Sequence, residues 1–236
     1  MPDKTTRIDR ARASRTEPPP QRLFEAILDA NRRRVGGDPS ASVRVEAFAA
    51  ELPVAALTCI DPRLNRLLPD QLGLPVDQFI WLRNAGNIIT GPLTSTMRSL
   101  ALACAVKGAR EIAIIGHSDC LVAKTTLKNL LVQLDALGVD RDRLPDNLSE
   151  YFGLFGTERH NVVRGVDLVR RSPLIGARVT VHGLLIDVHS GRLEWVVNGY
   201  HEPAATTIHA TSELLDEPDP VFDAPPLPGH SGCGTG

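Results

Sequence analysis

Short apolar runs alternate with longer amphipathic runs along this chain. The short runs are rich in β-branched residues, as is typical of buried strands, and they lie at residues 53–59, 78–82, 111–115, 179–188 and 193–197. The longer runs are typical of helices, and they lie at residues 21–34, 64–72, 94–106, 121–137, 149–155 and 158–171. The pattern predicts strands that alternate with helices, followed by a closing pair of strands joined at Ser190-Gly191.

This order of elements defines the expected fold class. Strand–helix alternation produces a parallel sheet covered by helices, and a closing pair of strands adds an antiparallel edge. We expect an α/β protein with a mainly parallel central sheet and an antiparallel edge, flanked by helices. A length of 236 residues suits one sizeable domain with extensions, and nothing in the pattern argues for two separate cores.

Three metal-capable side chains come at the ends of two predicted strands. His117 and Cys120 follow the strand that begins at Glu111, and Cys59 ends the run 53–59. If these strands are parallel neighbours, all three side chains emerge at one edge of the sheet, where open α/β sheets bind ligands. Two thiolates and one imidazole suit a catalytic zinc site whose fourth position is left to water. Buried thiols and a hydrogen-bonded histidine are the alternative.

Asp61 and Arg63 lie within four residues of Cys59 and would stand beside such a centre. A carboxylate acceptor next to an always-charged guanidinium fork suits control of a metal's open position. A solvated surface pair is the alternative for these two residues.

Several motifs together resemble the β-class carbonic anhydrases. They are Cys59-x-Asp61-x-Arg63, then Arg83-Asn84-Ala85-Gly86-Asn87, then Gly116-His117-x-x-Cys120. The similarity continues through Arg98-Ser99-Leu100 and the late stretch 183–193, and it covers roughly residues 22–200. The small residues around Gly86 permit close approach of the backbone in that loop.

The resemblance implies a function, a cofactor and an assembly. It implies one Zn²⁺ per chain on Cys59, His117 and Cys120, and reversible hydration of carbon dioxide to bicarbonate and a proton by a zinc-bound hydroxide. It also implies that Asp61 and Arg63 form a dyad that orients this hydroxide, or that Asp61 itself takes the fourth position in a resting form. Because the family's N-terminal helix commonly reaches a second subunit, we expect a homodimer or a higher homo-oligomer.

Two other functions fit the same residues. A related zinc hydrolase could act on carbonyl sulfide or carbon disulfide instead of carbon dioxide. A zinc-containing but inactive binding or scaffold protein would accommodate Pro62 and Leu121, which stand where the family usually has a small polar residue and a glycine.

The two ends of the chain differ from its middle. Residues 1–21 are basic and proline-rich, and residues 201–236 combine acidic residues with prolines, so we expect both segments to be disordered or mobile extensions of the zinc-binding domain at 22–200. Either extension could dock on a protein partner. His230 and Cys233 copy the histidine–cysteine spacing, but no predicted strand precedes them, so we do not expect them to be the catalytic pair.

Charge and hydropathy limit the expected partners. With 26 basic and 28 acidic residues the formal charge is −2, which gives no electrostatic reason to expect a nucleic acid. No apolar run approaches the ~20 residues of a membrane span, and the N-terminus does not resemble a secretory signal. We therefore expect a cytoplasmic protein without a membrane partner, which a protein assembly or microcompartment could house.

The remaining cysteine and histidine residues have no partner at ligand spacing. Cys104 lies in the apolar stripe of the helix predicted at 94–106, so we expect it in the core. We expect structural or solvent-facing roles for the other histidines, namely His160, His182, His189, His201 and His209. Proton transfer to buffer through one of them is the alternative.

Overall fold

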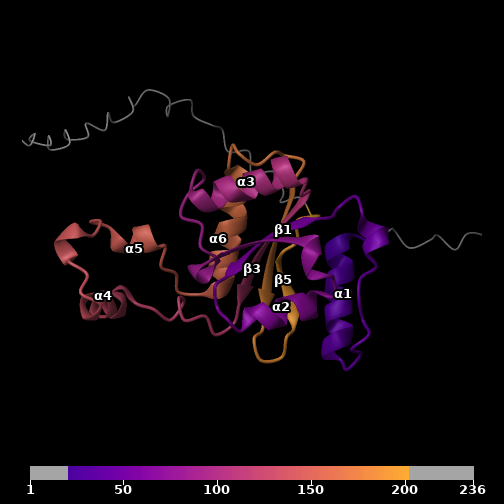
Figure 1. The fold of residues 1–236 in the computed structure, drawn as a ribbon, viewed down its shortest axis with the longest axis horizontal. Helices are drawn as coiled ribbons and strands as arrows, with labels where there is room; N and C mark the ends of the chain where they lie inside the picture. The colour runs from indigo at the N-terminus through magenta and orange to yellow at the C-terminus, as the bar shows by residue number, and fades with distance from the viewer. Residues whose placement is uncertain (1–20, 202–236) are drawn as a thin grey trace, which may run out of the picture. The chain divides into compact units, whose positions relative to one another are not determined.

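A five-stranded mixed sheet forms the centre of the computed structural model, which describes residues 21–201. The strand order is β2-β1-β3-β4-β5, with β2, β1, β3 and β4 parallel and β5 antiparallel to β4 (Figure 1). The strands are β1 Val54–Cys59, β2 Phe79–Asn84, β3 Glu111–His117, β4 Thr180–Ile186 and β5 Leu193–Val197. The predicted fold class is confirmed. The expectations for residues 1–20 and 202–236, including the His230–Cys233 pair, lie outside the described residues.

Six α-helices and four short 3₁₀ turns connect the strands of the described part. The α-helices are α1 Leu23–Val35, α2 Leu64–Leu72, α3 Ser95–Lys107, α4 Leu127–Ala136, α5 Leu148–Phe152 and α6 Glu158–Arg171. The 3₁₀ turns are η1 Val45–Phe48, η2 Val76–Gln78, η3 Ala85–Asn87 and η4 Arg141–Arg143. The predictions for α2, α6 and β5 match the observed bounds, and most of the others shift by one or two residues.

Two predicted helix bounds were wrong. The helix expected directly after Cys120 begins only at Leu127, because Thr126 caps it by accepting a hydrogen bond from the Asn129 amide (3.2 Å). Residues 121–124 form turns instead, and residues 125 and 126 lead into the helix. The helix expected to run to Phe155 ends at Phe152, since Gly153 adopts a left-handed conformation (φ 63°) that stops it.

The helices cover both faces of the sheet and bury two apolar clusters. On one face, α1 and α2 pack against alternate residues of β1, β3 and β4, with Phe24, Leu68 and Ile115 fully buried. On the other face, α3 and α6 pack against the intervening residues, with Leu100 and Ile114 fully buried. Because successive strand residues point to opposite faces, strands covered on both sides are apolar throughout, which explains the uninterrupted runs in the sequence.

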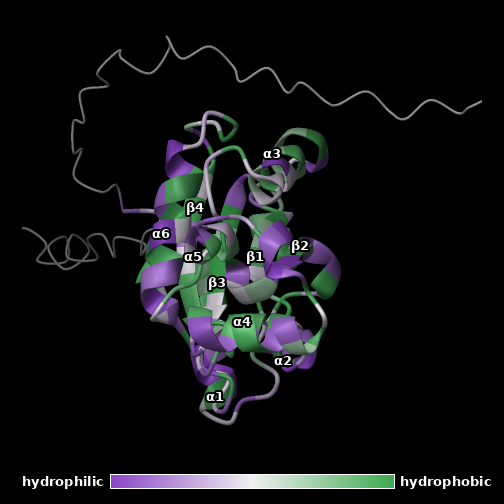
Figure 2. Cartoon of the chain, turned by 90° about the vertical axis from the view of Figure 1, so that its left-hand side faces the viewer, coloured by the Kyte–Doolittle hydropathy of each residue, from purple (hydrophilic) through white to green (hydrophobic). Residues whose placement is uncertain are grey.

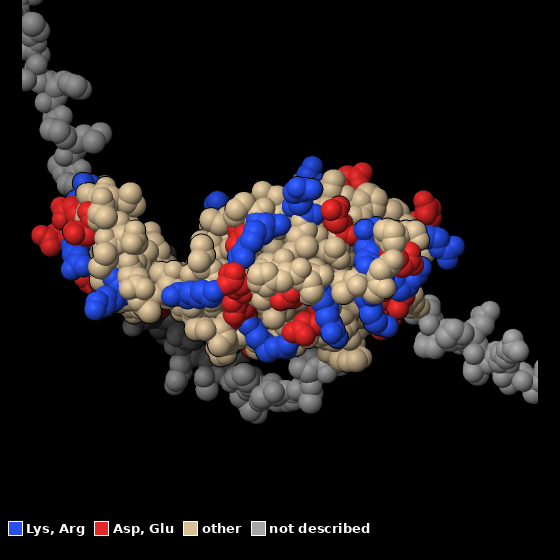
Figure 3. Space-filling view, turned by 90° about the horizontal axis from the view of Figure 1, so that it is seen from below, with Lys and Arg blue, Asp and Glu red and all other residues tan. Residues whose placement is uncertain are grey.

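The surface of the described residues carries charges of both signs. Figure 3 shows one face on which Lys and Arg are interspersed with Asp and Glu. Within residues 21–201, every helix falls short of the length and apolarity required to cross a membrane.

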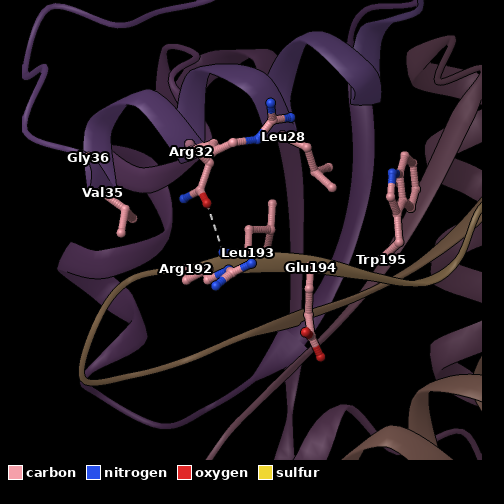
Figure 4. A pocket seen from close by; sticks show the side chains of 9 residues that line it. Leu28, Arg32, Val35, Gly36, Arg192, Leu193, Glu194 and Trp195 are labelled. Carbon is pink, nitrogen blue, oxygen red and sulfur yellow. Dashed lines mark hydrogen bonds between the residues drawn. The ribbon is translucent and has the colours of Figure 1, made fainter.

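Buried Asn31 joins α1 to the antiparallel edge of the sheet. Its Nδ2 donates to the carbonyl oxygens of Gly191 (2.9 Å) and Gln71 (3.1 Å), and its Oδ1 accepts from the Leu193 amide (2.8 Å). The last of these bonds is the dashed line in Figure 4, beside a cavity of about 440 Å³ between α1 and β5. This cavity is lined by none of the three predicted metal ligands.

Replacing Asn31 with leucine should destabilise the protein. Asn31→Leu keeps the volume but leaves the Leu193 amide and the Gly191 carbonyl buried without partners, so we expect a loss of about 2–5 kcal/mol in the free energy of unfolding. Urea denaturation at a fixed metal concentration measures it. Arg32→Ala, at an exposed position of the same helix, should change the free energy of unfolding by less than about 1 kcal/mol. Equal stability of Asn31→Leu and the wild type would contradict the role.

Candidate metal centre

The carboxyl ends of β1 and β3 bring the three predicted ligands together. β1 and β3 are parallel neighbours, so Cys59 at the end of one strand and His117 at the end of the other emerge at the same edge of the sheet. Cys120 follows in the turn after β3. The sulfur and imidazole atoms of these three residues lie within 4.8 Å of one another, and all three residues are buried. The group is therefore close enough to share one metal ion.

His117 is oriented as a metal-ligating histidine would be. Its Nδ1 lies 2.9 Å from the Ser118 carbonyl oxygen, which can only accept, so Nδ1 carries the proton and Nε2 has the free lone pair. Nε2 is one of three buried side-chain nitrogen or oxygen atoms within residues 21–201 that have no hydrogen-bond partner. A buried acceptor of this kind carries a cost unless it is paired. The lone pair therefore fits a cation held between Nε2 and the two sulfur atoms.

Of the two cysteines at the centre, Cys59 has the thiol that more readily becomes a thiolate. The neighbouring Cys120 thiol lowers the pKa of Cys59 to about 4 against the opposing effect of burial, and His117 and the amides of Asp61 and Gly86 add to the lowering. The Gly86 amide donates to Cys59 Sγ at 3.2 Å. The pKa of Cys120 is raised in turn by the Cys59 sulfur. A metal cation that binds both sulfur atoms would displace any proton that they carry.

The pKa of His117 is raised above its ordinary value. Burial acts in the opposite direction, but the Cys59 sulfur and the Ser118 carbonyl favour the charged ring and outweigh it. The same negative charge that favours a proton on this ring would favour a cation beside it.

The loop after β2 supplies the amide that faces Cys59. Asn84 folds this loop, because its Nδ2 donates to the Ile88 carbonyl (2.7 Å) and its Oδ1 accepts from the Ile88 amide (2.9 Å). Gly86 adopts φ 69°, and a Cβ there would come within 2.8 Å of the Phe155 ring. Asn161 of α6 donates to the Gly86 carbonyl at 2.8 Å. The expected close approach of backbone at Gly86 is confirmed.

Three further hydrogen bonds, none of them expected from the sequence, fix the turn that carries Cys120. Glu158, the first residue of α6, accepts from the Cys120 amide through Oε1 (3.2 Å). Ser118 donates to Asp187 Oδ2 (2.9 Å) and accepts from the Val188 amide (3.0 Å), which ties the turn to the end of β4. An isolated polar residue such as Glu158 gives no sequence signal for this role.

Asp61 and Arg63 form a bidentate ion pair beside the centre. Arg63 donates from Nε to Asp61 Oδ1 (3.0 Å) and from Nη2 to Asp61 Oδ2 (2.7 Å), while its amide donates to Asp61 Oδ1 (2.9 Å). These bonds hold the pKa of Asp61 below its ordinary value and raise that of Arg63. The Asp61 side chain is only 10% exposed, so this pair differs from the solvated alternative.

Comparison with known proteins agrees with this geometry. The family model described as carbonic anhydrase matches residues 54–193, which include both elements that meet at the centre. The chain belongs to the β-class carbonic anhydrase family.

Relatives of this carbonic anhydrase family member include proteins with two different named activities. YtiB of Bacillus subtilis (strain 168), provisionally named a carbonic anhydrase, is 34% identical over 63% of this chain and 82% of its own. A carbon disulfide hydrolase of Acidithiobacillus thiooxidans is 32% identical over 57% of this chain and 72% of its own. The crystal structure of β-carbonic anhydrase isoform I of Trichomonas vaginalis superposes with a TM-score of 0.60, at 28% identity, over 75% of this chain and 98% of that one.

The two departures from the usual family pattern leave the geometry of the centre intact. Pro62 lies in a tight turn in which the Asp61 side chain still accepts from the Arg63 amide, so the missing Pro62 amide breaks no contact of this pair. The Leu121 side chain is 72% exposed and points to solvent rather than into the centre.

The other histidine and cysteine residues of the described part lie outside the centre. His182 is fully buried at the opposite end of the sheet, where its Nδ1 accepts from the Gly199 amide (3.0 Å) and its Nε2 lies 3.2 Å from Glu111 Oε2. Cys104 is half-buried at the rim of the second apolar cluster rather than within it. His160, His189 and His201 are exposed, whereas His209 lies outside the described residues.

Loss of one ligand should empty the centre. We expect one divalent metal ion per purified wild-type chain, and a reduction of metal affinity by more than about a hundredfold in Cys59→Ser and Cys120→Ser, because a serine hydroxyl does not replace a thiolate ligand. Metal analysis by mass spectrometry after dialysis measures the content. Cys104→Ser is the matched control and should keep one ion per chain. Full metal content in either ligand variant would contradict the assignment.

Proposed function

We propose that this protein catalyses the zinc-dependent reversible hydration of carbon dioxide to bicarbonate and a proton. The observation that carries the proposal is the convergence of Cys59, His117 and Cys120, with the buried His117 Nε2 otherwise unpartnered. Three ligands of this kind suit a catalytic zinc ion with one open position. When bound, zinc supplies a water with a pKa lowered to about 7, which makes a nucleophile available at neutral pH.

The residues of the chain have separate roles in this proposal. Cys59, His117 and Cys120 would hold the ion, and the Gly86 amide stabilises the Cys59 thiolate. Asp61 remains a carboxylate at neutral pH because Arg63 lowers its pKa, so it accepts a hydrogen bond from the reacting water and does not donate one. Arg63 fixes the orientation of that carboxylate through the two parallel hydrogen bonds from its guanidinium group.

A hydrolase acting on carbon disulfide or carbonyl sulfide is the second candidate. The observation that favours it is the 32% identity to a protein named carbon disulfide hydrolase. Hydrolysis of the sulfur compounds would use the same metal, the same water and the same aspartate, so these residues do not distinguish the substrates. An inactive binding or scaffold protein is the third candidate.

One assay separates the three candidates. Stopped-flow hydration of carbon dioxide would be measured on metal-analysed protein, beside the release of hydrogen sulfide from carbon disulfide and carbonyl sulfide. Rapid hydration with slow sulfide release supports the proposal, and the reverse supports the hydrolase. Zinc-loaded protein that turns over none of the three would overturn both enzymatic functions.

Asp61 provides the sharpest test of the roles within the site. Asp61→Asn should retain zinc but lose about a hundredfold in kcat/KM for hydration, because the amide turns a donor toward Arg63 and presents one acceptor oxygen instead of two. Asp70→Asn, an exposed carboxylate on α2, is the charge-matched control and should keep wild-type turnover. Wild-type turnover in Asp61→Asn at neutral and alkaline pH would rule out the role.

We also propose that the protein works as a homodimer or a higher homo-oligomer. The segment from residue 121 to residue 157, here called the arm, carries α4 and α5, neither of which has a buried residue. Figure 2 shows a mainly hydrophobic α4, and Val132, Leu137 and Tyr151 are 56%, 79% and 63% exposed. Helices this short are marginal in water unless other surfaces cover them. A second copy of the chain that covers the arm would supply that burial.

The mass in solution tests this assembly. Light scattering should give at least twice the chain mass of 25.6 kDa. The double variant Val132→Asp, Leu137→Asp should shift the population toward monomer, because each carboxylate would be buried without a partner. Leu102→Asp, at a 53% exposed position on α3, is the control and should leave the mass unchanged. A monomeric wild type at micromolar concentration would overturn the proposal.

A further inference from the structure

Arg63 is held from two sides, and only one of them is Asp61. The edge formed by Nε and Nη2 faces Asp61. On the other edge, Nη1 donates to Asp119 Oδ2 (2.8 Å) and Nη2 donates to the main-chain carbonyl of Asp119 (2.9 Å). All three nitrogen atoms of the guanidinium are therefore engaged, and the group lies between two aspartates from different loops.

The backbone of Asp119 has an unusual conformation in which it makes this double contact. Asp119 lies between His117 and Cys120 and adopts φ 58°, which is uncommon for a residue other than glycine. Aspartate and asparagine tolerate this left-handed region better than most side chains. With this backbone, the carboxylate and the carbonyl of one residue both reach Arg63. Lys124 contacts the remaining oxygen, Asp119 Oδ1, from the solvent side.

We propose that Asp119 is a positioning residue, which clamps the Arg63 guanidinium so that the Asp61 carboxylate is held beside the metal centre. This inference rests on the proposed function, because it assigns Asp119 a part in the same reaction. Asp119 acts through Arg63 and need not touch the substrate. Its position in the turn between two of the predicted ligands links the loop after β1 to the turn after β3.

A purely conformational role for Asp119 makes the opposite prediction for one substitution. If the turn needed only the left-handed backbone, glycine would serve as well as aspartate or better. If the carboxylate is the working group, Asp119→Gly fits the backbone but releases one side of Arg63. Asparagine keeps both the backbone tolerance and an acceptor oxygen for Nη1.

The kinetic experiment compares these variants at equal zinc content. We expect kcat for carbon dioxide hydration to fall at least about tenfold in Asp119→Gly with little change in KM, since a hydrogen bond between charged groups is lost away from the substrate. Asp119→Asn should stay within about threefold of the wild type. Wild-type kcat in Asp119→Gly would overturn the proposal.

Two further variants test whether the effect passes through Arg63. In an Arg63→Met background, the additional change Asp119→Gly should cost little, because its partner is already gone. Lys124→Ala removes the exposed neighbour of Asp119 and should change kcat by no more than about twofold. Additive losses in the double variant, or an equal loss in Lys124→Ala, would overturn the proposal.

Chemical modification provides a readout that does not depend on turnover. Phenylglyoxal attacks free guanidinium groups, so Arg63 should be modified slowly in the wild type and in Asp119→Asn, and several-fold faster in Asp119→Gly. Mass spectrometry of the Arg63 peptide measures the rate, and exposed Arg192 is the internal control that should react equally in all three proteins.

The two readouts separate failure of the clamp from failure of the proposed function. A wild type that hydrates no carbon dioxide overturns the function, and the modification rates then decide the clamp alone. An active wild type whose Arg63 reacts equally fast with and without Asp119 overturns the clamp and leaves the function standing. Faster modification of Arg63 together with a lower kcat supports both.

Discussion

Two sulfur atoms and one imidazole nitrogen are buried within 4.8 Å of one another, and the surrounding structure depends on making that arrangement tolerable. Buried polar atoms carry a cost unless they are paired. The Gly86 amide donates to Cys59 Sγ, and His117 Nδ1 donates to the Ser118 carbonyl. Nε2 of His117 has no hydrogen-bond partner within the described residues, and a metal ion at this position would satisfy it.

The contacts around the centre come from several separate elements of the fold. The loop after β2 carries Gly86, α6 carries Glu158 and Asn161, and the end of β4 holds Ser118 through Asp187. The strand ends therefore position the candidate ligands, while the neighbouring loops and α6 supply the hydrogen bonds that fix their orientation and charge. Loops also hold Arg63, which lies between Asp61 in the loop after β1 and Asp119 in the turn after β3.

Family membership and substrate identity rest on different parts of the molecule. The match over residues 54–193 and the fold establish the family. Relatives named for carbon dioxide chemistry and for carbon disulfide chemistry both match this chain. The arm borders the Gly86 loop beside the centre through Val122 and Phe155.

The sequence by itself determined the strands, the fold class and the candidate ligands, because each depends on local pattern: apolar runs for buried strands, and Cys59, His117 and Cys120 directly at their ends. It misplaced the helix after Cys120 because residues 121–123 are apolar and continue the pattern backward from the helix, whereas the Thr126 cap sets the true start. Only the tertiary structure decided that β1 and β3 are neighbours and that His182 is buried. It also decided that Glu158 contacts the Cys120 amide, Asn161 the Gly86 carbonyl and Asp119 the Arg63 guanidinium. These facts join residues 38 to 75 positions apart, and such pairings are set by packing of the whole chain, which no local pattern encodes.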